Sequence, residues 1–183
     1  AHATTQWAFL GNINKSTRKS MHAALTTVPK GLFFQSHSFA HDMMPPHKVR
    51  QALMNSIFCP APTGDINPDS FRFSEALEAG CIPIVDAGRN YPSDGYYLEY
   101  FRCHPALAGD PTNFSDFILQ VQNQAGWRAV PSLIAKMMTN VTLIQERQAA
   151  MIRWWQRFKD QLGRLVASRI RHLRSGSGSL YSL

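Results

Sequence analysis

The sequence predicts an α/β protein built on a Rossmann-like sheet that is open, mostly parallel and covered by helices on both faces. Short apolar runs alternate with segments of helical periodicity, as in consecutive strand–helix–strand units. The clearest unit is residues 71–85, where an amphipathic helix ends at Gly80 and an apolar strand follows at once. The 183 residues, of which 44% are apolar, provide enough chain for one domain with a core and an appended element.

The first half of the chain carries four predicted strands, each a short apolar run bounded by glycine, proline or polar residues. Ser16 or Thr17 stands where it can cap one helix, and Asp69 or Ser70 where it can cap another. The predicted strands are 7–10, 32–35, 57–59 and 82–85, the predicted helices are 18–25, 47–54 and 71–79, and loops are expected over 36–46 and 60–68.

The second half of the chain is less regular. A strand is expected over 97–101 and a helix over 117–124. Apolar residues at helical spacing then predict a long helical region over 131–173, with breaks near Asn140 and Gly163. The predicted organisation is a Rossmann-like domain (1–143), a basic amphipathic helical extension (144–174) and a flexible tail (175–183).

The net charge of +7 is concentrated in the predicted helical extension. Its tryptophans, Trp154 and Trp155, are expected to pack on the body of the domain. Its cations make residues 147–174 a candidate surface for an acidic protein or an anionic lipid. Nucleic-acid binding is not favoured, because no recognised binding module accompanies the charge. The extension holds Arg147, Arg153, Arg157, Lys159, Arg164, Arg169, Arg171 and Arg174 against only Glu146 and Asp160.

The cysteines and histidines predict neither a metal site nor a redox motif. Cys59 and Cys81 fall in predicted buried strands, where cysteine usually acts as a small hydrophobic residue, so we expect free thiols there. Nothing selects a partner for Cys103. The histidines at 37, 41 and 47 lack a fourth ligand at matching spacing.

Targeting signals are few. Residues 1–6 are short and polar, so we expect no targeting segment within this chain, and no apolar run reaches the roughly 18–20 residues of a membrane span. Glycosylation acceptor sequences at Asn14, Asn113 and Asn140 are a small indication of a secretory protein.

Two loops are candidates for ligand binding, because ligands of open parallel sheets lie outside the carboxyl ends of the strands. These loops are 11–18 and 60–70. The second leads into the helix that carries Arg72 and Glu75, which stand three residues apart and so share a face. A cation beside a carboxylate can hold a phosphate and a ribose. The alternative is a surface ion pair worth about 0.3 kcal/mol.

The same region resembles a known family. Residues 55–65 read NSIFCPAPTGD and residues 69–85 read DSFRFSEALEAGCIPIV. They are similar to the exostosin-type glycosyltransferase pattern S-x-F-C-x-x-P-x-G-D followed by R-x-x-E-A-L-x-x-G-C-I-P-V. The earlier FLGN of residues 9–12, followed by Arg18, is similar to the opening strand, glycine and arginine of that family. The resemblance covers residues 7–85 in order and spacing.

This resemblance implies the carboxy-terminal half of a GT-B fold, in which two Rossmann-like halves face each other and this half binds the nucleotide-sugar donor. The implied donor is a nucleoside diphosphate sugar, UDP-linked, used by an inverting enzyme with no metal cofactor. The resemblance implies that Glu75 binds the ribose hydroxyls of the donor and that Arg72 and Arg18 face its diphosphate. It adds Gly11, Gly64 and Ser70 as further donor-nucleotide-binding positions.

The family's amino-terminal half, which supplies acceptor contacts and usually the catalytic base, has no counterpart in these residues. Neither do its membrane anchor and stem. We therefore expect that this chain alone does not turn over. The resemblance implies a secretory or Golgi location. The alternative function is a non-catalytic descendant of the fold that acts as a structural or interaction subunit through its basic carboxy-terminal helix.

Overall fold

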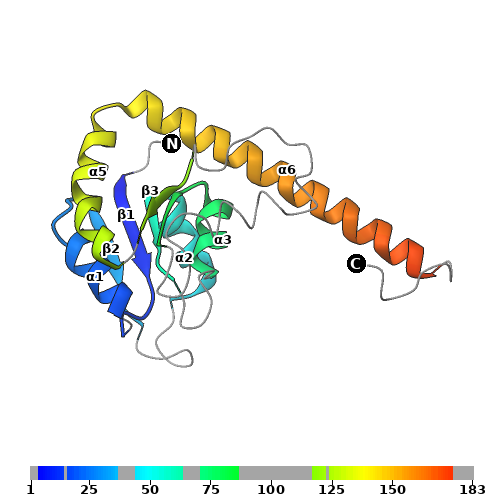
Figure 1. Ribbon diagram of the computed structural model, residues 1–183, viewed down its shortest axis with the longest axis horizontal. Coiled ribbons are helices and arrows are strands. Elements are labelled where there is room, and N and C mark those ends of the chain that lie inside the picture. Colours follow the sequence, from blue (N-terminus) through cyan, green and yellow to red (C-terminus); the bar gives the residue numbers. More distant parts are fainter. Residues whose placement is uncertain are drawn as a thin grey trace.

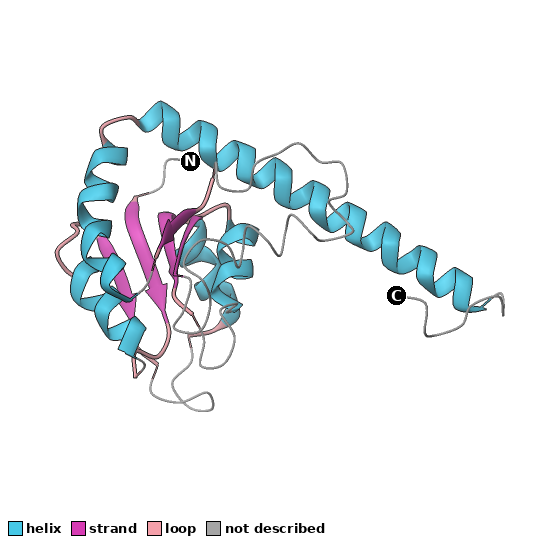
Figure 2. Ribbon diagram, in the orientation of Figure 1, coloured by secondary structure: helices cyan, strands magenta, loops and turns pink. Residues whose placement is uncertain are grey.

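The computed structural model describes residues 4–14, 16–36, 44–63, 71–86, 117–122 and 124–174, and Figures 1 and 2 show their arrangement. The predicted strand 97–101, the tail 175–183, His37, His41 and Cys103 lie outside these residues. The elements are β1 (Thr5–Leu10), α1 (Ser16–Leu25), β2 (Gly31–Phe34), α2 (Pro46–Met54), β3 (Ser56–Ala61), α3 (Phe71–Ala79), β4 (Ile82–Asp86), β5 (Leu119–Val121), the 3₁₀ helix η3 (Gln124–Ala129), α5 (Val130–Met138) and α6 (Val141–Arg174).

The strands form one five-stranded sheet in the order β2-β1-β3-β4-β5, and every pair is parallel. The predicted fold class is therefore confirmed. The chain runs outward from β1 to β2 on one side and from β3 to β5 on the other. This order reverses direction between β1 and β3, and the carboxyl ends of those strands border the crevice where such folds bind ligands.

Helices cover both faces of the sheet because side chains along β1 alternate between them (Figure 2). Trp7 and Phe9 pack with α1 and α5 on one face. Ala8 and Leu10 pack with α2 and α3 on the other face.

The step from α3 into β4 is the predicted helix–glycine–strand unit. Gly80 has a left-handed backbone with φ +72°, which glycine adopts readily. The Cys81 N–H donates to the Ala76 carbonyl (3.0 Å) and the Gly80 N–H to the Leu77 carbonyl (3.2 Å). These two bonds are the Schellman arrangement that closes a helix. The predicted glycine stop is confirmed.

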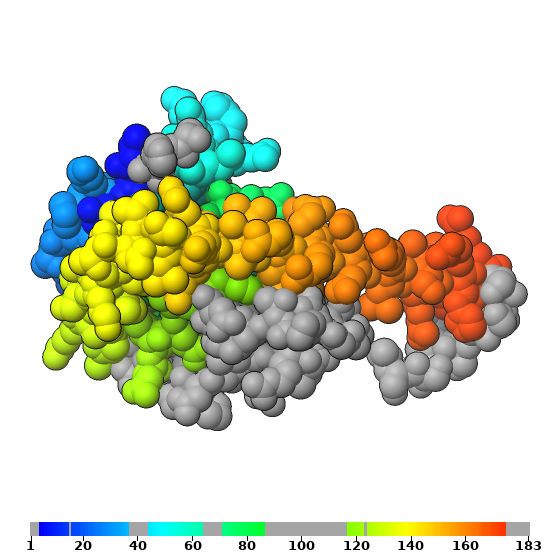
Figure 3. Space-filling view, turned by 90° about the horizontal axis from the view of Figure 1, so that it is seen from above, coloured from blue at the N-terminus to red at the C-terminus, as the bar shows by residue number. Residues whose placement is uncertain are grey.

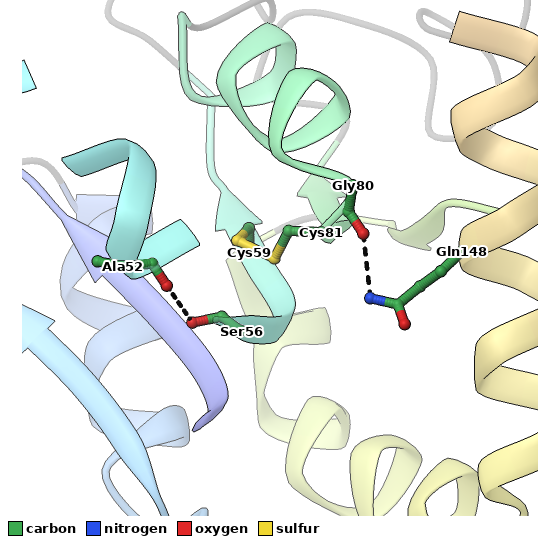
Figure 4. The surroundings of a disulfide bond; sticks show 6 residues. All are labelled: Ala52, Ser56, Cys59, Gly80, Cys81 and Gln148. Carbon is green, nitrogen blue, oxygen red and sulfur yellow. Dashed lines mark hydrogen bonds between the residues drawn. A yellow bond between two sulfur atoms is a disulfide. The ribbon is translucent and has the colours of Figure 1, made fainter. Parts of the chain in front are cut away.

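A disulfide joins Cys59 of β3 to Cys81, so the predicted free thiols are wrong (Figure 4). Both residues are buried, as expected. The register between β3 and β4 pairs Phe58 with Ile82, which places Cys59 and Cys81 diagonally on the same face of the sheet. Their Cα atoms are 5.7 Å apart, within the range of disulfide bonds.

Residues 117–124 are not the predicted helix. Leu119–Val121 forms β5, which pairs with β4 from Ile84 to Asp86. The reason is burial: Phe117, Ile118, Leu119 and Val121 are all buried. A position beside β4 buries this apolar run, and helical structure starts later, at Gln124.

The helix α6 has 34 residues, which corresponds to about 50 Å. The predicted break near Asn140 is confirmed, because α5 ends at Met138 and the Asn140 side chain accepts the Leu143 N–H (3.0 Å). The predicted break at Gly163 is wrong. A single glycine costs a helix about 1 kcal/mol, and the helix continues through it.

The two halves of α6 have different surroundings. Ile144, Met151, Trp154 and Phe158 are buried against the body of the domain. Gln148 donates to the Gly80 carbonyl (3.0 Å), as Figure 4 shows. Every residue over 163–174 is exposed. Figures 1 and 3 show this orange-to-red end extending past the coloured body of the domain.

Candidate functional site

A cavity of about 300 Å³ lies between α2 and α3, at the carboxyl ends of β1 and β2. It contains three of the predicted site residues, Gly11, Arg72 and Glu75. Gly11 lies near the start of residues 7–85, and Arg72 and Glu75 lie near their end. The sheet brings them together, because β1 pairs with β3 and α3 follows β3 in the chain. The rest of the wall is Leu10, Phe34, Ser36, Met44, Pro46, Val49, Arg50, Leu53, Glu78 and Ala79.

Arg72 and Glu75 form an ion pair near the start of α3. Arg72 Nη1 donates to Glu75 Oε2 at 2.7 Å, and the side chains are 31% and 39% exposed. The surface-pair alternative from the sequence is thus present in the structure, but the pair faces the cavity. Because it is half-exposed, it contributes little to stability and its groups can exchange partners with a ligand.

Gly11 allows the Arg72 guanidinium to lie over the carboxyl end of β1. A Cβ atom at position 11 would stand 2.9 Å from Arg72 Nη2 and 3.3 Å from Nε. Gly11 also continues the pairing of β1 with β2, since its N–H donates to the Phe34 carbonyl (2.9 Å). Because glycine has no Cβ atom, the Arg72 guanidinium can lie close to the backbone at position 11. The FLGN motif marked Gly11, but only the structure identifies Arg72 as its neighbour.

Arg18 is not part of the cavity wall. It lies in the first turn of α1, and its Nη1 donates to the Asn12 carbonyl at 3.0 Å. In this position Arg18 holds the 11–14 segment to α1. Gly64 and Ser70, the other two predicted site residues, lie outside the described residues.

Asp86 lies outside the cavity wall but contacts both candidate loops, and none of the sequence motifs marked it. It ends β4 and is 1% exposed. Its Oδ1 accepts the Thr63 N–H (3.1 Å), and its Oδ2 accepts the Trp127 indole N–H (2.8 Å) and the Thr17 hydroxyl. The available signal was an acidic residue directly after the apolar run Ile82–Val85, at the carboxyl end of a predicted central strand.

Glu78 was also missed, and it connects the cavity with α6. Its Oε2 accepts the Trp155 indole N–H (2.7 Å) and the Lys159 ammonium (2.8 Å). The hydrogen bond from Lys159, and then that from Trp155, lowers the pKa of Glu78 below its ordinary value of 4.5. Arg50 across the cavity acts in the same direction.

The cavity combines charged groups with an apolar wall. Its charged groups balance, with Arg50 and Arg72 against Glu75 and Glu78, and most of the remaining wall is apolar. Such a site suits a ligand with an apolar ring, hydroxyl groups and an anionic part. Within the described ranges, no three His, Cys, Asp or Glu side chains gather as metal ligands do. None of the helices in those ranges is both long and apolar enough to cross a membrane.

In comparisons with known proteins, neither a protein-family model nor a curated protein matches this chain. The resemblance to exostosin-type glycosyltransferases stays a prediction carried by the motifs of residues 7–85.

Proposed function

We propose that this chain is the donor-binding half of an exostosin-like, inverting glycosyltransferase and binds a UDP-linked sugar between α2 and α3. The observation that carries the proposal is the position of Gly11, Arg72 and Glu75 in one cavity beside the strand-order reversal. All three belong to the motifs of residues 7–85 that resemble the family.

The groups in the cavity suit the parts of such a donor. The Glu75 carboxylate accepts two hydrogen bonds from a ribose diol, and the Arg72 guanidinium donates to the diphosphate. The apolar wall around Phe34 and Val49 suits a planar base. Gly64 and Ser70 keep their proposed roles at the diphosphate. Arg18 lies outside the cavity wall, so its proposed role is indirect, through the 11–14 segment that it holds to α1.

The proposal covers binding and not turnover. In the family, acceptor contacts and the catalytic base come from the other half of the enzyme, so we expect no transfer by this chain alone. The Cys59–Cys81 disulfide supports a secretory location, because disulfides persist in oxidising compartments.

Calorimetric titration with UDP tests this function. We expect the wild-type chain to bind UDP and Glu75→Ala to weaken binding by about 1–3 kcal/mol, since a polar ligand group loses its partner. Glu146→Ala is the matched control, because Glu146 is an exposed helical carboxylate outside the cavity wall. The proposal fails if the wild-type chain does not bind UDP, or if both variants bind equally well.

A second candidate function is that of an interaction subunit whose α6 end binds an anionic lipid surface. The specific observation is the exposed segment 163–174, which carries both charge and apolar area. It has four arginines and no acidic residue. Its large apolar side chains are 43–49% exposed, namely Leu165, Val166, Ile170 and Leu173.

Vesicle flotation tests this second function. An amphipathic basic helix should bind vesicles rich in phosphatidylserine and leave vesicles of pure phosphatidylcholine unbound. Leu165→Ser/Leu173→Ser should lose the binding, whereas Ser168→Ala should keep it. Equal recovery with both vesicle types, or with neither, contradicts this function.

A further inference from the structure

The carboxylate of Asp86 joins segments that are far apart in the sequence. Thr17 lies in the first turn of α1, Thr63 follows β3, and Trp127 belongs to η3. The two threonines mark the loops 11–18 and 60–70, from which the sequence predicted ligand contacts. Asp86 thus binds both candidate loops through one side chain.

In the part of the chain that the structure describes, the hydrogen-bond donors to Asp86 are all uncharged. Its three donors are a hydroxyl, a backbone N–H and an indole N–H. Burying a carboxylate is costly unless hydrogen bonds replace the lost water. Asp86 and Trp127 are 1% and 0% exposed, so the carboxylate does not contact a ligand in the cavity. Its role is the arrangement of other groups.

We infer that Asp86 is the positioning residue that sets the distance between the start of α1 and the end of β3. Through Thr17 it fixes the first turn of α1, from which Arg18 holds the Asn12 carbonyl. Through Thr63 it fixes the point at which the second candidate loop begins. The effect on ligand affinity rests on the proposed function, whereas the effect on the two segments does not.

The first test removes one contact with little change of shape. Thr17→Val deletes the hydroxyl. Thr27→Val is the matched control, because the exposed Thr27 hydroxyl donates to the Ala24 carbonyl three residues earlier and not, among the described residues, to a distant segment. We expect amide hydrogen exchange over residues 11–18 to become about tenfold faster in Thr17→Val, as for one lost hydrogen bond to a charged group. The control should leave it unchanged. Equal exchange in both variants overturns the inference.

The second test separates positioning from charge. In Asp86→Asn, the amide oxygen can still accept the Thr63 N–H and the amide nitrogen can donate to Thr17, but it then faces the indole N–H of Trp127. Adding Trp127→Phe removes that opposing donor. We expect Asp86→Asn alone to speed exchange over 11–18 about tenfold, and Asp86→Asn/Trp127→Phe to return it to the level of Trp127→Phe. Failure of this rescue overturns positioning and indicates a role for the negative charge.

UDP titration of the same variants tests whether the positioning by Asp86 affects ligand affinity at the candidate site. The affinity should fall in Asp86→Asn and recover in the double variant, parallel to the exchange rates. If exchange follows the expected order and wild-type UDP binding is absent, the positioning role stands and the proposed function fails. If UDP binds equally well to all variants, positioning of the ligand site by Asp86 is overturned while the proposed function stands.

Discussion

Asp86 and Glu75 are two carboxylates of the same domain with opposite surroundings. Asp86 is 1% exposed and accepts hydrogen bonds from three different segments. The Glu75 side chain is 39% exposed and contacts Arg72 on the same helix. A saturated, buried carboxylate holds the fold in place, whereas an exposed one with an exchangeable partner can bind a ligand. The contrast distinguishes a residue that supports the candidate site, Asp86, from one that is available to a ligand, Glu75.

The largest expected effect is the difference in the free energy of unfolding between two single variants, one without the Asp86 carboxylate and one without the Glu75 carboxylate. Asp86→Ala leaves buried donors at Thr63 and Trp127 without an acceptor, so we expect it to lower the free energy of unfolding by about 3–5 kcal/mol. Glu75→Ala should lower it by about 0.5 kcal/mol or less, because its ion pair is half-exposed. Urea denaturation of both variants measures the difference. Similar losses in the two variants would contradict the contrast between these carboxylates.

Reduction of the Cys59–Cys81 disulfide should have the next largest effect. The cysteines are 22 residues apart, and closing a loop of this size stabilises a protein by about 3 kcal/mol. The bond lies at the end of α3, the helix that carries Glu75. We therefore expect reduction to speed hydrogen exchange in α3 more than in α1, which Asp86 holds. Uniform acceleration in both helices would contradict this expectation.

Acid should have the smallest effect, and it acts through Glu78. Its pKa in the folded chain is below 4.5, so its contribution is present above pH 4.5 and is lost as the pH falls through the folded value. Because the Glu78 side chain is 51% exposed, the contribution is about 0.5 kcal/mol or less. Glu78→Gln should therefore flatten the pH dependence of Trp155 fluorescence below pH 4.5. An unchanged profile would exclude Glu78 as its source.

The sequence predicted the elements whose signals are local. Gly80 and the apolar run after it predicted the step from α3 to β4. Asn140 predicted the helix break that lies directly before α6. The apolar run of 117–121 has no such marker, because an apolar segment suits a buried strand as well as a helix. Gly163 was interpreted as a helix break, but a glycine in an exposed helix lowers stability without ending it.

The same division applies to the candidate site. Motifs selected Gly11, Arg72 and Glu75, and the structure places them in one cavity. Asp86 and Glu78 could not be selected in this way, because their partners lie between 23 and 81 residues away in the sequence. No local pattern encodes which distant donors a carboxylate will meet.

The α/β class, the alternation of strands and helices and the charged pair of α3 could all be predicted from the residues in order. The Cys59–Cys81 bond, the approach of Arg72 to Gly11 and the three donors around Asp86 became visible only in the folded chain. The two groups differ in the distance along the chain between the residues that interact. Helix periodicity and caps depend on neighbours within a few residues, whereas these contacts depend on strand order and register, which the whole sheet fixes together.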